Sequence, residues 1–317
     1  MRIIFAGTPH VAVPTLQELL RSPHEVVSVL TRPPARSGRG RTLHPSPVAE
    51  VAAAAGIGLI EASSLREDDI RDRIEALHAD LGVVVAYGAI IPAPVLTMPR
   101  LGWVNLHFSD LPRWRGAAPV QWTLLSGDPT TASCVFRLEA GLDTGPVFSR
   151  MPVDIGHETA GELLGRMSVL GARQVLDVVD ALAAGTAHAT PQDTGEDGSA
   201  TTHARKLQAA DGFVDFTDPA EQVDRRIRAT TPDPGAWTTL PDGRRLRLGA
   251  VVPLEAASPG TGALLVSRHS VEVGCAHGLV RLGQVAPAGK GWMDAASWAR
   301  GARLHEDDRL GWGRVTQ

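Results

Sequence analysis

The first half of the chain alternates between short, almost wholly apolar runs and longer segments in which apolar residues recur every three to four positions. The short runs predict buried strands and lie at residues 2–6, 25–31, 81–86 and 103–107. The longer segments have the spacing of amphipathic helices and lie at residues 11–20, 47–55, 65–78 and 160–184. Strands that alternate with helices predict an α/β fold, in which helices cover both faces of a parallel-rich sheet.

The pattern changes near residue 190. Residues 190–202 are polar and contain almost no apolar side chains, which is typical of a linker. The short apolar runs that follow are separated by Gly and Pro turns and lie at residues 237–240, 245–252, 262–266, 270–275 and 279–285. Such regularly spaced strands predict a small β-barrel or sandwich. We therefore expect an α/β domain at 1–189, a linker at 190–205 and a β-domain at 206–317.

Composition narrows the class of protein. The chain has 317 residues, of which 43% are hydrophobic and 21% charged, as in ordinary folded proteins of about two domains. Its longest uncharged apolar stretch, Val83–Leu96, contains two prolines and is too short to cross a bilayer. Met1–Gly7 reads directly as a strand, so we expect no signal peptide, no membrane association and a cytoplasmic location. The 11 histidines and 2 cysteines lack the spacing of metal ligands, so no metal site is expected.

The net charge of −4 argues at first against a nucleic-acid partner, because binding to phosphates needs positive charge. The charge is uneven, however. Residues 1–202 carry 16 basic and 22 acidic side chains, whereas residues 203–317 carry 15 basic and 13 acidic ones. Within the acidic part, residues 32–47 contain four arginines and no carboxylate. Basic surface is therefore expected in two places, the loop at 32–47 and the C-terminal domain.

The densest group of polar residues begins in the predicted strand at 103–107. Asn105 and His107 lie two positions apart, so both side chains point to one face of the sheet. Ligands of open α/β sheets bind at the carboxyl ends of strands, where an amide and an imidazole can polarise a carbonyl group and manage a proton. A purely structural pair is the alternative. Asp143, in a glycine-rich turn, is either a turn former or a carboxylate that orients His107.

Six blocks of sequence accompany these residues: Ile3–Pro9, Gly38–Gly40 with Pro45–Val48, Val84–Gly88, Leu111–Pro119, Gly141–Gly145 and Pro287–Lys290. Together with the Asn-x-His motif, they resemble the folate-dependent formyltransferases along almost the whole chain. The resemblance implies a Rossmann-like formyltransferase domain followed by an OB-like β-barrel. It also implies transfer of the formyl group of 10-formyltetrahydrofolate to the α-amino group of methionine on initiator tRNA.

The resemblance also implies roles for individual residues. Asn105, His107 and Asp143 match the family's catalytic trio. In that trio the amide would donate to the oxyanion that forms on the formyl group, while the imidazole and the carboxylate would manage the proton of the attacking amine.

The family's folate-binding segments are also matched. Its folate loop corresponds to Ser109, Asp110, Leu111 and Pro112, and its pterin pocket to the backbone of Ala86, Tyr87 and Gly88. The chain departs from the family at Phe108, where a small residue is common, and at Asp110, where Leu is common. Asp110 alters the folate pocket if it points at the folate, and matters little if it faces solvent.

The tRNA-binding residues implied by the resemblance are basic. Arg36, Arg39 and Arg41 lie in an insertion that enters near the acceptor end of the tRNA. Arg39 is the best candidate for a base or phosphate contact, because the glycines on either side let the backbone approach closely. In the C-terminal domain, Lys206 and Lys290 are expected to contact phosphates along the acceptor arm. Since no long exposed apolar helix is expected, we predict a monomer.

Two kinds of alternative remain open. The first is another formyl-folate enzyme, which acts on a nucleotide sugar or a purine precursor, or which releases formate by hydrolysis. The sugar and purine enzymes should lack the arginine loop together with a basic β-domain, and a hydrolase should carry a regulatory domain instead. The second alternative is a non-catalytic RNA-binding protein that kept the fold, against which the intact set of Asn105, His107 and Asp143 argues.

Overall fold

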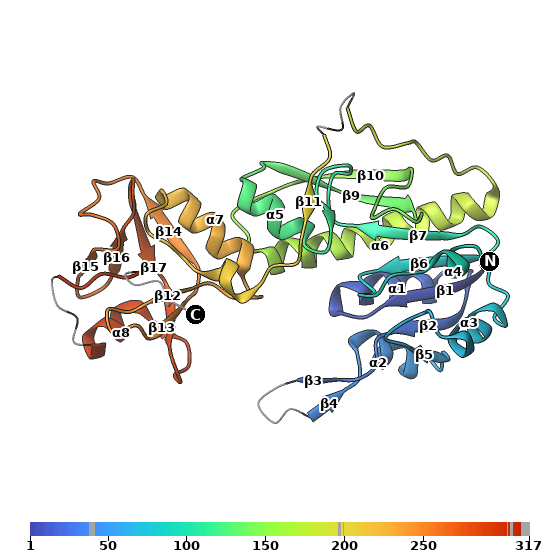
Figure 1. Ribbon diagram of the computed structural model, residues 1–317, viewed down its shortest axis with the longest axis horizontal. Helices are drawn as coiled ribbons and strands as arrows, with labels where there is room; N and C mark the ends of the chain where they lie inside the picture. Colours follow the sequence, from blue (N-terminus) through green and yellow to red (C-terminus); the bar gives the residue numbers. More distant parts are fainter. Residues whose placement is uncertain (38–41, 196–197, 199, 303, 305–306, 312–317) are drawn as a thin grey trace. The chain divides into compact units, whose positions relative to one another are not determined.

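The computed structural model describes residues 1–37, 42–195, 198, 200–302, 304 and 307–311. The chain forms two compact units (Figure 1). Unit 1 comprises Met1–Pro119, Thr130–Asp154 and Leu164–Ala204, and unit 2 comprises Val120–Pro129, Ile155–Leu163 and Arg205–Gln317. The predicted fold class is confirmed, because unit 1 has a parallel-rich sheet and most of unit 2 is antiparallel β-structure.

Unit 1 is built on a seven-stranded sheet with the order β10-β9-β7-β6-β1-β2-β5. Its strands are β1 (Arg2–Gly7), β2 (Glu25–Thr31), β5 (Leu59–Glu61), β6 (Leu81–Val85), β7 (Trp103–His107), β9 (Thr130–Arg137) and β10 (Val147–Asp154). The five strands from β5 to β7 are parallel, while β9 and β10 are antiparallel. Every residue of β6 is buried, which explains its unbroken apolar run. All four predicted strands are confirmed.

Helices flank the strands of this sheet. They are α1 (Val13–Arg21), α2 (Pro47–Ala54), α3 (Asp68–Glu75), α4 (Ala93–Leu96) and the part of α6 (Ala160–Ala184) from Leu164 onward, with a short 3-10 turn at His10–Ala12. Helix α5 (Pro119–Ser126) belongs to unit 2 from Val120 onward. The start of α2 follows from its sequence, because the Ser46 hydroxyl accepts a hydrogen bond from the Ala49 amide and Pro47 occupies the first turn. The predicted helix at 65–78 is shorter than expected, since Leu65 lies before it and is buried in the core.

The basic segment at 32–47 was expected to be a loop, but its described part is a hairpin. Strands β3 (Ala35–Ser37) and β4 (Thr42–His44) pair in antiparallel register. Arg36 lies in β3 with an exposed side chain. Arg39 and Arg41 lie outside the described residues.

Tyr87, the only tyrosine of the chain, is 1% exposed and lies two residues after the end of β6. Its hydroxyl donates to the Ala62 carbonyl at 3.0 Å. Burial raises the pKa of Tyr87 to about 12, and the nearby Arg32 opposes this shift. The buried phenol therefore contributes to the stability of unit 1 in its neutral form.

Titration of Tyr87 gives a direct test of this core. Because its pKa in the folded chain lies above the ordinary value of 10, its stabilisation is fully present below pH 10 and is lost as the pH rises to about 12. The loss is at most about 3 kcal/mol. Ultraviolet absorbance of the phenolate should show a midpoint near 12 in the folded chain and near 10 in denaturant. A folded-state midpoint near 10 would contradict this account.

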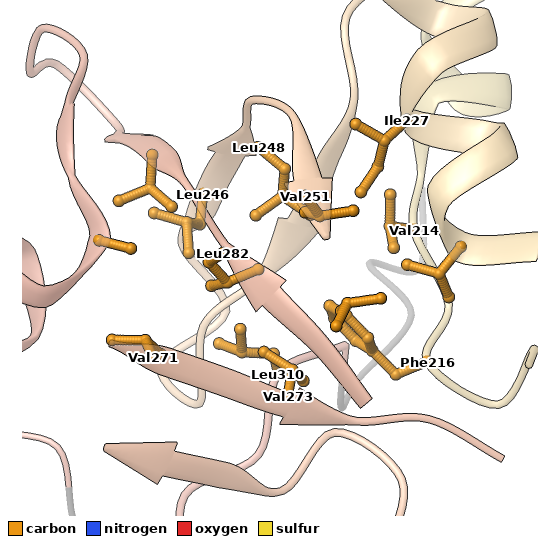
Figure 2. Packing of buried hydrophobic residues seen from close by; sticks show 14 of the residues in the cluster. Val214, Phe216, Ile227, Leu246, Leu248, Val251, Val271, Val273, Leu282 and Leu310 are labelled. Atoms are coloured by element: carbon orange, nitrogen blue, oxygen red, sulfur yellow. The ribbon is translucent and has the colours of Figure 1, made fainter. Parts of the chain in front are cut away.

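Unit 2 packs helices against two four-stranded antiparallel sheets. One sheet has the order β12-β13-β18-β19 and the other β14-β17-β16-β15. The elements are α7 (Ala220–Thr230), β12 (Trp237–Thr239), β13 (Arg245–Leu248), β14 (Val251–Leu254), β15 (Leu264–Val266), β16 (Val271–Gly274), β17 (Leu279–Leu282), β18 (Gln284–Pro287), β19 (Met293–Asp294) and α8 (Ala295–Ala302). Figure 2 shows their shared core, to which Leu246, Leu282 and Phe216 belong.

Two of the predicted strands in unit 2 are each divided into two. The run at 245–252 becomes β13 and β14, and the run at 279–285 becomes β17 and β18. In both cases the chain passes from one sheet to the other at a glycine. A Cβ on Gly283 would lie 2.7 Å from the Ala250 carbonyl oxygen, so only glycine fits this corner. The apolar pattern runs through both corners because the residues on either side face the same core.

Candidate functional site

Asn105 and His107 lie in β7, at the middle and at the carboxyl end of the strand. Asn105 is opposite Val84 of the parallel strand β6, and His107 is opposite Cys134 of the antiparallel strand β9. The strand ends here because the chain turns into the loop that begins at Ser109. As residues two positions apart in one strand, they point to the same face of the sheet. His107 lies at the carboxyl end of β7, the end at which ligands of open α/β sheets bind.

His107 is buried, and its ring nitrogens have different partners. Nε2 lies 3.0 Å from the carbonyl oxygen of Trp114, and Nδ1 lies 3.8 Å from Oδ2 of Asp143. A carbonyl oxygen only accepts hydrogen bonds, so Nε2 carries a hydrogen. In the neutral imidazole Nδ1 is then the free base, and it faces a carboxylate that would stabilise the charged form.

Asp143 comes from the turn between β9 and β10, and its side chain is only 12% exposed. Its Oδ2 accepts a hydrogen bond of 2.8 Å from the Gly116 amide. A Cβ on Gly145 would collide with the Arg137 carbonyl oxygen, so glycine is required for the turn to close. The structure thus brings Asp143 to His107, across 36 positions of sequence.

Backbone strain gathers around these residues. Among the described residues, four that are not glycine have a positive φ. Two of them are predicted site residues, Ala86 (48°) and Asp143 (53°), and a third, Trp114 (59°), holds His107 through its carbonyl oxygen. This conformation is unfavourable for residues with a Cβ and concentrates at functional sites. The strain supports a functional rather than a purely structural interpretation of the segments.

Asn105 is half-buried, and its amide makes no hydrogen bond with any residue that the structure describes. Asn105 is also the only asparagine of the chain. A partly buried amide that lacks a protein partner is available to a ligand. Asn105 can therefore donate to a carbonyl oxygen held beside His107.

Burial raises the pKa of the neighbouring Cys134 thiol to about 11. The thiol is therefore protonated near neutral pH, when a nucleophilic cysteine would need to be a thiolate. Cys134 is a core residue rather than a nucleophile. Among the described residues, no group of histidine, cysteine or carboxylate side chains is arranged to hold a metal ion.

The loop of Ser109–Pro112 leaves the end of β7 and is held from two sides. The Ser109 hydroxyl is buried and donates to the Arg113 carbonyl at 2.7 Å. Asp110 is half-exposed and forms an ion pair with Arg150 of β10. The same guanidinium donates to the Leu111 carbonyl at 2.6 Å. Asp110 thus fastens the loop to the sheet edge, whereas Phe108 is buried.

We expect Arg150→Met to loosen this loop. The change removes the Asp110 ion pair and the bond to Leu111, which together are worth about 1 kcal/mol at this partly exposed position. If the loop binds the folate, the KM for 10-formyltetrahydrofolate should rise roughly 3- to 10-fold with kcat nearly unchanged. Arg173→Met is the matched control, since Arg173 forms an exposed ion pair with Asp177 on α6. Equal KM values in the two variants would show that the loop does not hold the folate.

In the segment Ala86–Gly88, the Tyr87 ring lies in the core, and Ala86 and Gly88 are exposed. The Tyr87 carbonyl accepts a hydrogen bond from the Thr8 hydroxyl, and the Gly88 carbonyl accepts one from the Arg32 guanidinium. Both bonds are 2.8 Å long. The two carbonyls are thereby fixed, and the exposed Ala86 and Gly88 are the accessible part of the segment.

The described basic candidates are exposed but belong to different units. Arg36 lies in unit 1, whereas Lys206 and Lys290 lie in unit 2. Their side chains take part in no ion pair with a described carboxylate. Their charged groups are therefore available for contacts with phosphates.

The sequence interpretation missed one group of residues around the site, which it assigned to the linker. Strand β11 (His203–Ala204) pairs with β8 (Arg115–Gly116), and the Arg115 amide donates to the Thr202 carbonyl at 2.9 Å. Gln192 contacts both Arg115 and the Asp143 turn. The β-bridge between Val147 and Thr190 also holds this segment. A polar segment has no hydrophobic period, so its sequence gives no sign of these bonds.

Two family matches cover most of the chain. Residues 1–179 match the formyl transferase family and residues 206–303 match the formyl transferase C-terminal domain. The described helices include none that is both long and apolar enough to span a membrane.

Individual proteins agree with these matches. The chain is 48% identical to the methionyl-tRNA formyltransferase of Acidothermus cellulolyticus, with 96% of this chain and 98% of that protein covered. It is 49% identical to that of Thermobifida fusca, with coverages of 98% and 99%. The solved methionyl-tRNA formyltransferase from Clostridium thermocellum has a similar fold, with a TM-score of 0.57, 18% identity, and coverages of 80% and 93%.

Proposed function

Because the chain belongs to the formyl transferase family, we propose that it transfers the formyl group of 10-formyltetrahydrofolate to the α-amino group of methionine on initiator tRNA. The single observation that carries the mechanism is the pairing of His107 with Asp143, on the strand that also carries the Asn105 amide, which makes no hydrogen bond with a described residue. These groups match what formyl transfer requires, namely an oxyanion donor and a buried group that handles a proton.

In the reaction, the neutral amine attacks the formyl carbon and a new C–N bond forms. The carbonyl electrons move to the oxygen, so an oxyanion and a cationic amine develop together. Collapse of this intermediate breaks the bond between the formyl carbon and N10 of the folate. The amine loses one proton and N10 gains one, so the products are formyl-methionyl-tRNA and tetrahydrofolate.

Asn105 donates its amide hydrogen to the oxyanion in this proposal. His107 takes the amine proton on Nδ1, because Nε2 is already committed to the Trp114 carbonyl. Asp143 then stabilises the imidazolium, since its Oδ2 lies 3.8 Å from Nδ1. The Gly116 amide holds that carboxylate in place.

Substrate binding is divided along the chain. We propose that residues 1–189 carry the folate and catalytic site, with Ser109–Pro112 and Ala86–Gly88 as folate-binding segments. Residues 206–317 form the tRNA-binding domain, and 190–205 connect the two. Exposed positive charge supports phosphate contacts at Arg36, Lys206 and Lys290. Arg39 and Arg41 are proposed as tRNA contacts from sequence alone. The enzyme acts as a monomer in the cytoplasm, where charged tRNA is used.

A panel of acceptors tests the proposal and its alternatives. Purified protein is given 10-formyltetrahydrofolate together with initiator Met-tRNA, elongator Met-tRNA, an amino-sugar nucleotide, or no acceptor. We expect formylation of initiator Met-tRNA alone, with a rate that falls as salt is raised. Formate release without an acceptor would indicate a hydrolase, and formylation of the nucleotide would indicate a sugar enzyme. Binding of tRNA without turnover would indicate a non-catalytic protein.

A further inference from the structure

Gln192 lies in the polar segment after α6, two residues beyond the β-bridge between Val147 and Thr190. Its side chain is half-buried and uses all of its hydrogen-bonding capacity. Nε2 donates to the carbonyls of Asp143 and Gly145, at 2.8 and 2.9 Å. Oε1 accepts from Nη2 and Nε of Arg115, at 2.7 and 3.2 Å.

The orientation of this amide is fixed by its partners. A guanidinium only donates hydrogen bonds and a carbonyl only accepts them, so Oε1 faces Arg115 and Nε2 faces the turn. A glutamate at this position would keep the acceptor but lose both donors. Glutamine is therefore the side chain of this length that satisfies both sides.

Arg115 is buried, with 9% of its surface exposed, and no carboxylate of the described residues pairs with it. Its guanidinium instead donates a hydrogen bond to the neutral amide oxygen of Gln192. A buried cation is costly unless a polar group solvates it. Gln192 satisfies this cation without adding a negative charge beside Asp143.

The two segments that Gln192 joins are the two that set the geometry of His107 and Asp143. One is the turn that carries Asp143. The other is Trp114–Gly116, whose Trp114 carbonyl holds His107 and whose Gly116 amide holds the Asp143 carboxylate. Arg115, to which Gln192 bonds, lies in the sequence between the Trp114 carbonyl and the Gly116 amide.

We propose that Gln192 is a positioning residue of the transfer reaction, which holds the Asp143 turn against Trp114–Gly116 so that the carboxylate faces His107. The inference rests on the proposed function, because it concerns the same imidazole and carboxylate. Gln192 itself touches neither substrate nor reacting atoms. Its loss lets the turn shift, and Asp143 then stabilises the imidazolium less well.

Two variants separate the donor and acceptor roles. Gln192→Met keeps the length and removes all four bonds, and Gln192→Glu keeps the bonds from Arg115 but cannot donate to the turn. We expect kcat to fall roughly 10- to 100-fold in both, with the KM for 10-formyltetrahydrofolate changed by less than about threefold.

The matched control is Gln174→Met in α6. Gln174 is also tied by its amide to other segments of unit 1, since it bonds with Ser133 and Ser149. That variant should lose thermal stability but keep the wild-type kcat. The proposal is overturned if Gln192→Met behaves like Gln174→Met, or if Gln192→Glu retains wild-type kcat. An inactive wild type would instead remove the proposed function, and this inference with it.

Discussion

Replacing His107 with alanine is expected to lower kcat for formyl transfer by about 10²- to 10⁴-fold, the range that a positioned proton-transfer group contributes. Without the imidazole, no side chain takes the amine proton at the place where Asp143 can stabilise the resulting charge. The KM values for folate and tRNA should change little, because His107 acts after the substrates are bound.

His24→Ala is the matched control for this variant. The His24 side chain is 7% exposed, compared with 6% for His107, and each imidazole faces a carboxylate. His24 lies 2.8 Å from Asp180 and away from the predicted site residues in the sequence. Both variants should lose some stability, but only His107→Ala should lose turnover. If the two variants have equal kcat, His107 is not part of the mechanism.

Asn105→Ala is expected to lower kcat by about 10²- to 10³-fold, as found when one oxyanion donor is removed from other enzymes. The effect falls on kcat rather than KM, because the amide's interaction strengthens only when charge develops on the formyl oxygen. Thermal stability should hardly change, since the Asn105 amide makes no hydrogen bond with any described residue. A loss of stability with kcat retained would contradict the role.

The single asparagine of the chain allows a second measurement of the same residue. Selective ¹⁵N-asparagine labelling gives one side-chain amide signal, that of Asn105. Addition of a stable formyl-folate analogue should move this signal if the amide meets the formyl oxygen. An unmoved signal in the presence of a bound analogue would place Asn105 outside the site.

Four of the five parallel strands were predictable because burial on both faces leaves unbroken apolar runs, as in Leu81–Val85. The fifth, β5, was missed, because it has only three residues, of which only the middle one is buried. Strand β10 was missed, because its burial alternates irregularly at the sheet edge and it carries Arg150 among exposed positions. The runs at 245–252 and 279–285 were predicted as single strands. Each run bends at a glycine from one sheet to the other, but the apolar residues on both sides of the bend face the same core. The apolar pattern therefore continues through the bend and does not reveal it.

The sequence predicted some residues of the candidate site better than others. Asn105 and His107 share a strand, so their common face follows from period-two geometry. The approach of Asp143 depended on the family resemblance, since nothing local separates a catalytic carboxylate from a turn former. Gln192 carried no signal, because its four bonds are to backbone groups and to one guanidinium that are distant in sequence.

Net charge was the least informative property of the chain. The value of −4 sums over both units and hides exposed Arg36, Lys206 and Lys290. Binding to tRNA needs positive charge only where phosphates pass, so the local distribution matters and the total does not.

Formylation of initiator Met-tRNA by the purified chain tests the central claim most directly. Protein, methionyl initiator tRNA and 10-formyltetrahydrofolate are incubated, and the amino acid released from the tRNA is identified by mass. The account predicts formyl-methionine from the wild type and almost none from His107→Ala in the same time. Unmodified methionine from the wild type, with tRNA and folate both intact, would contradict it.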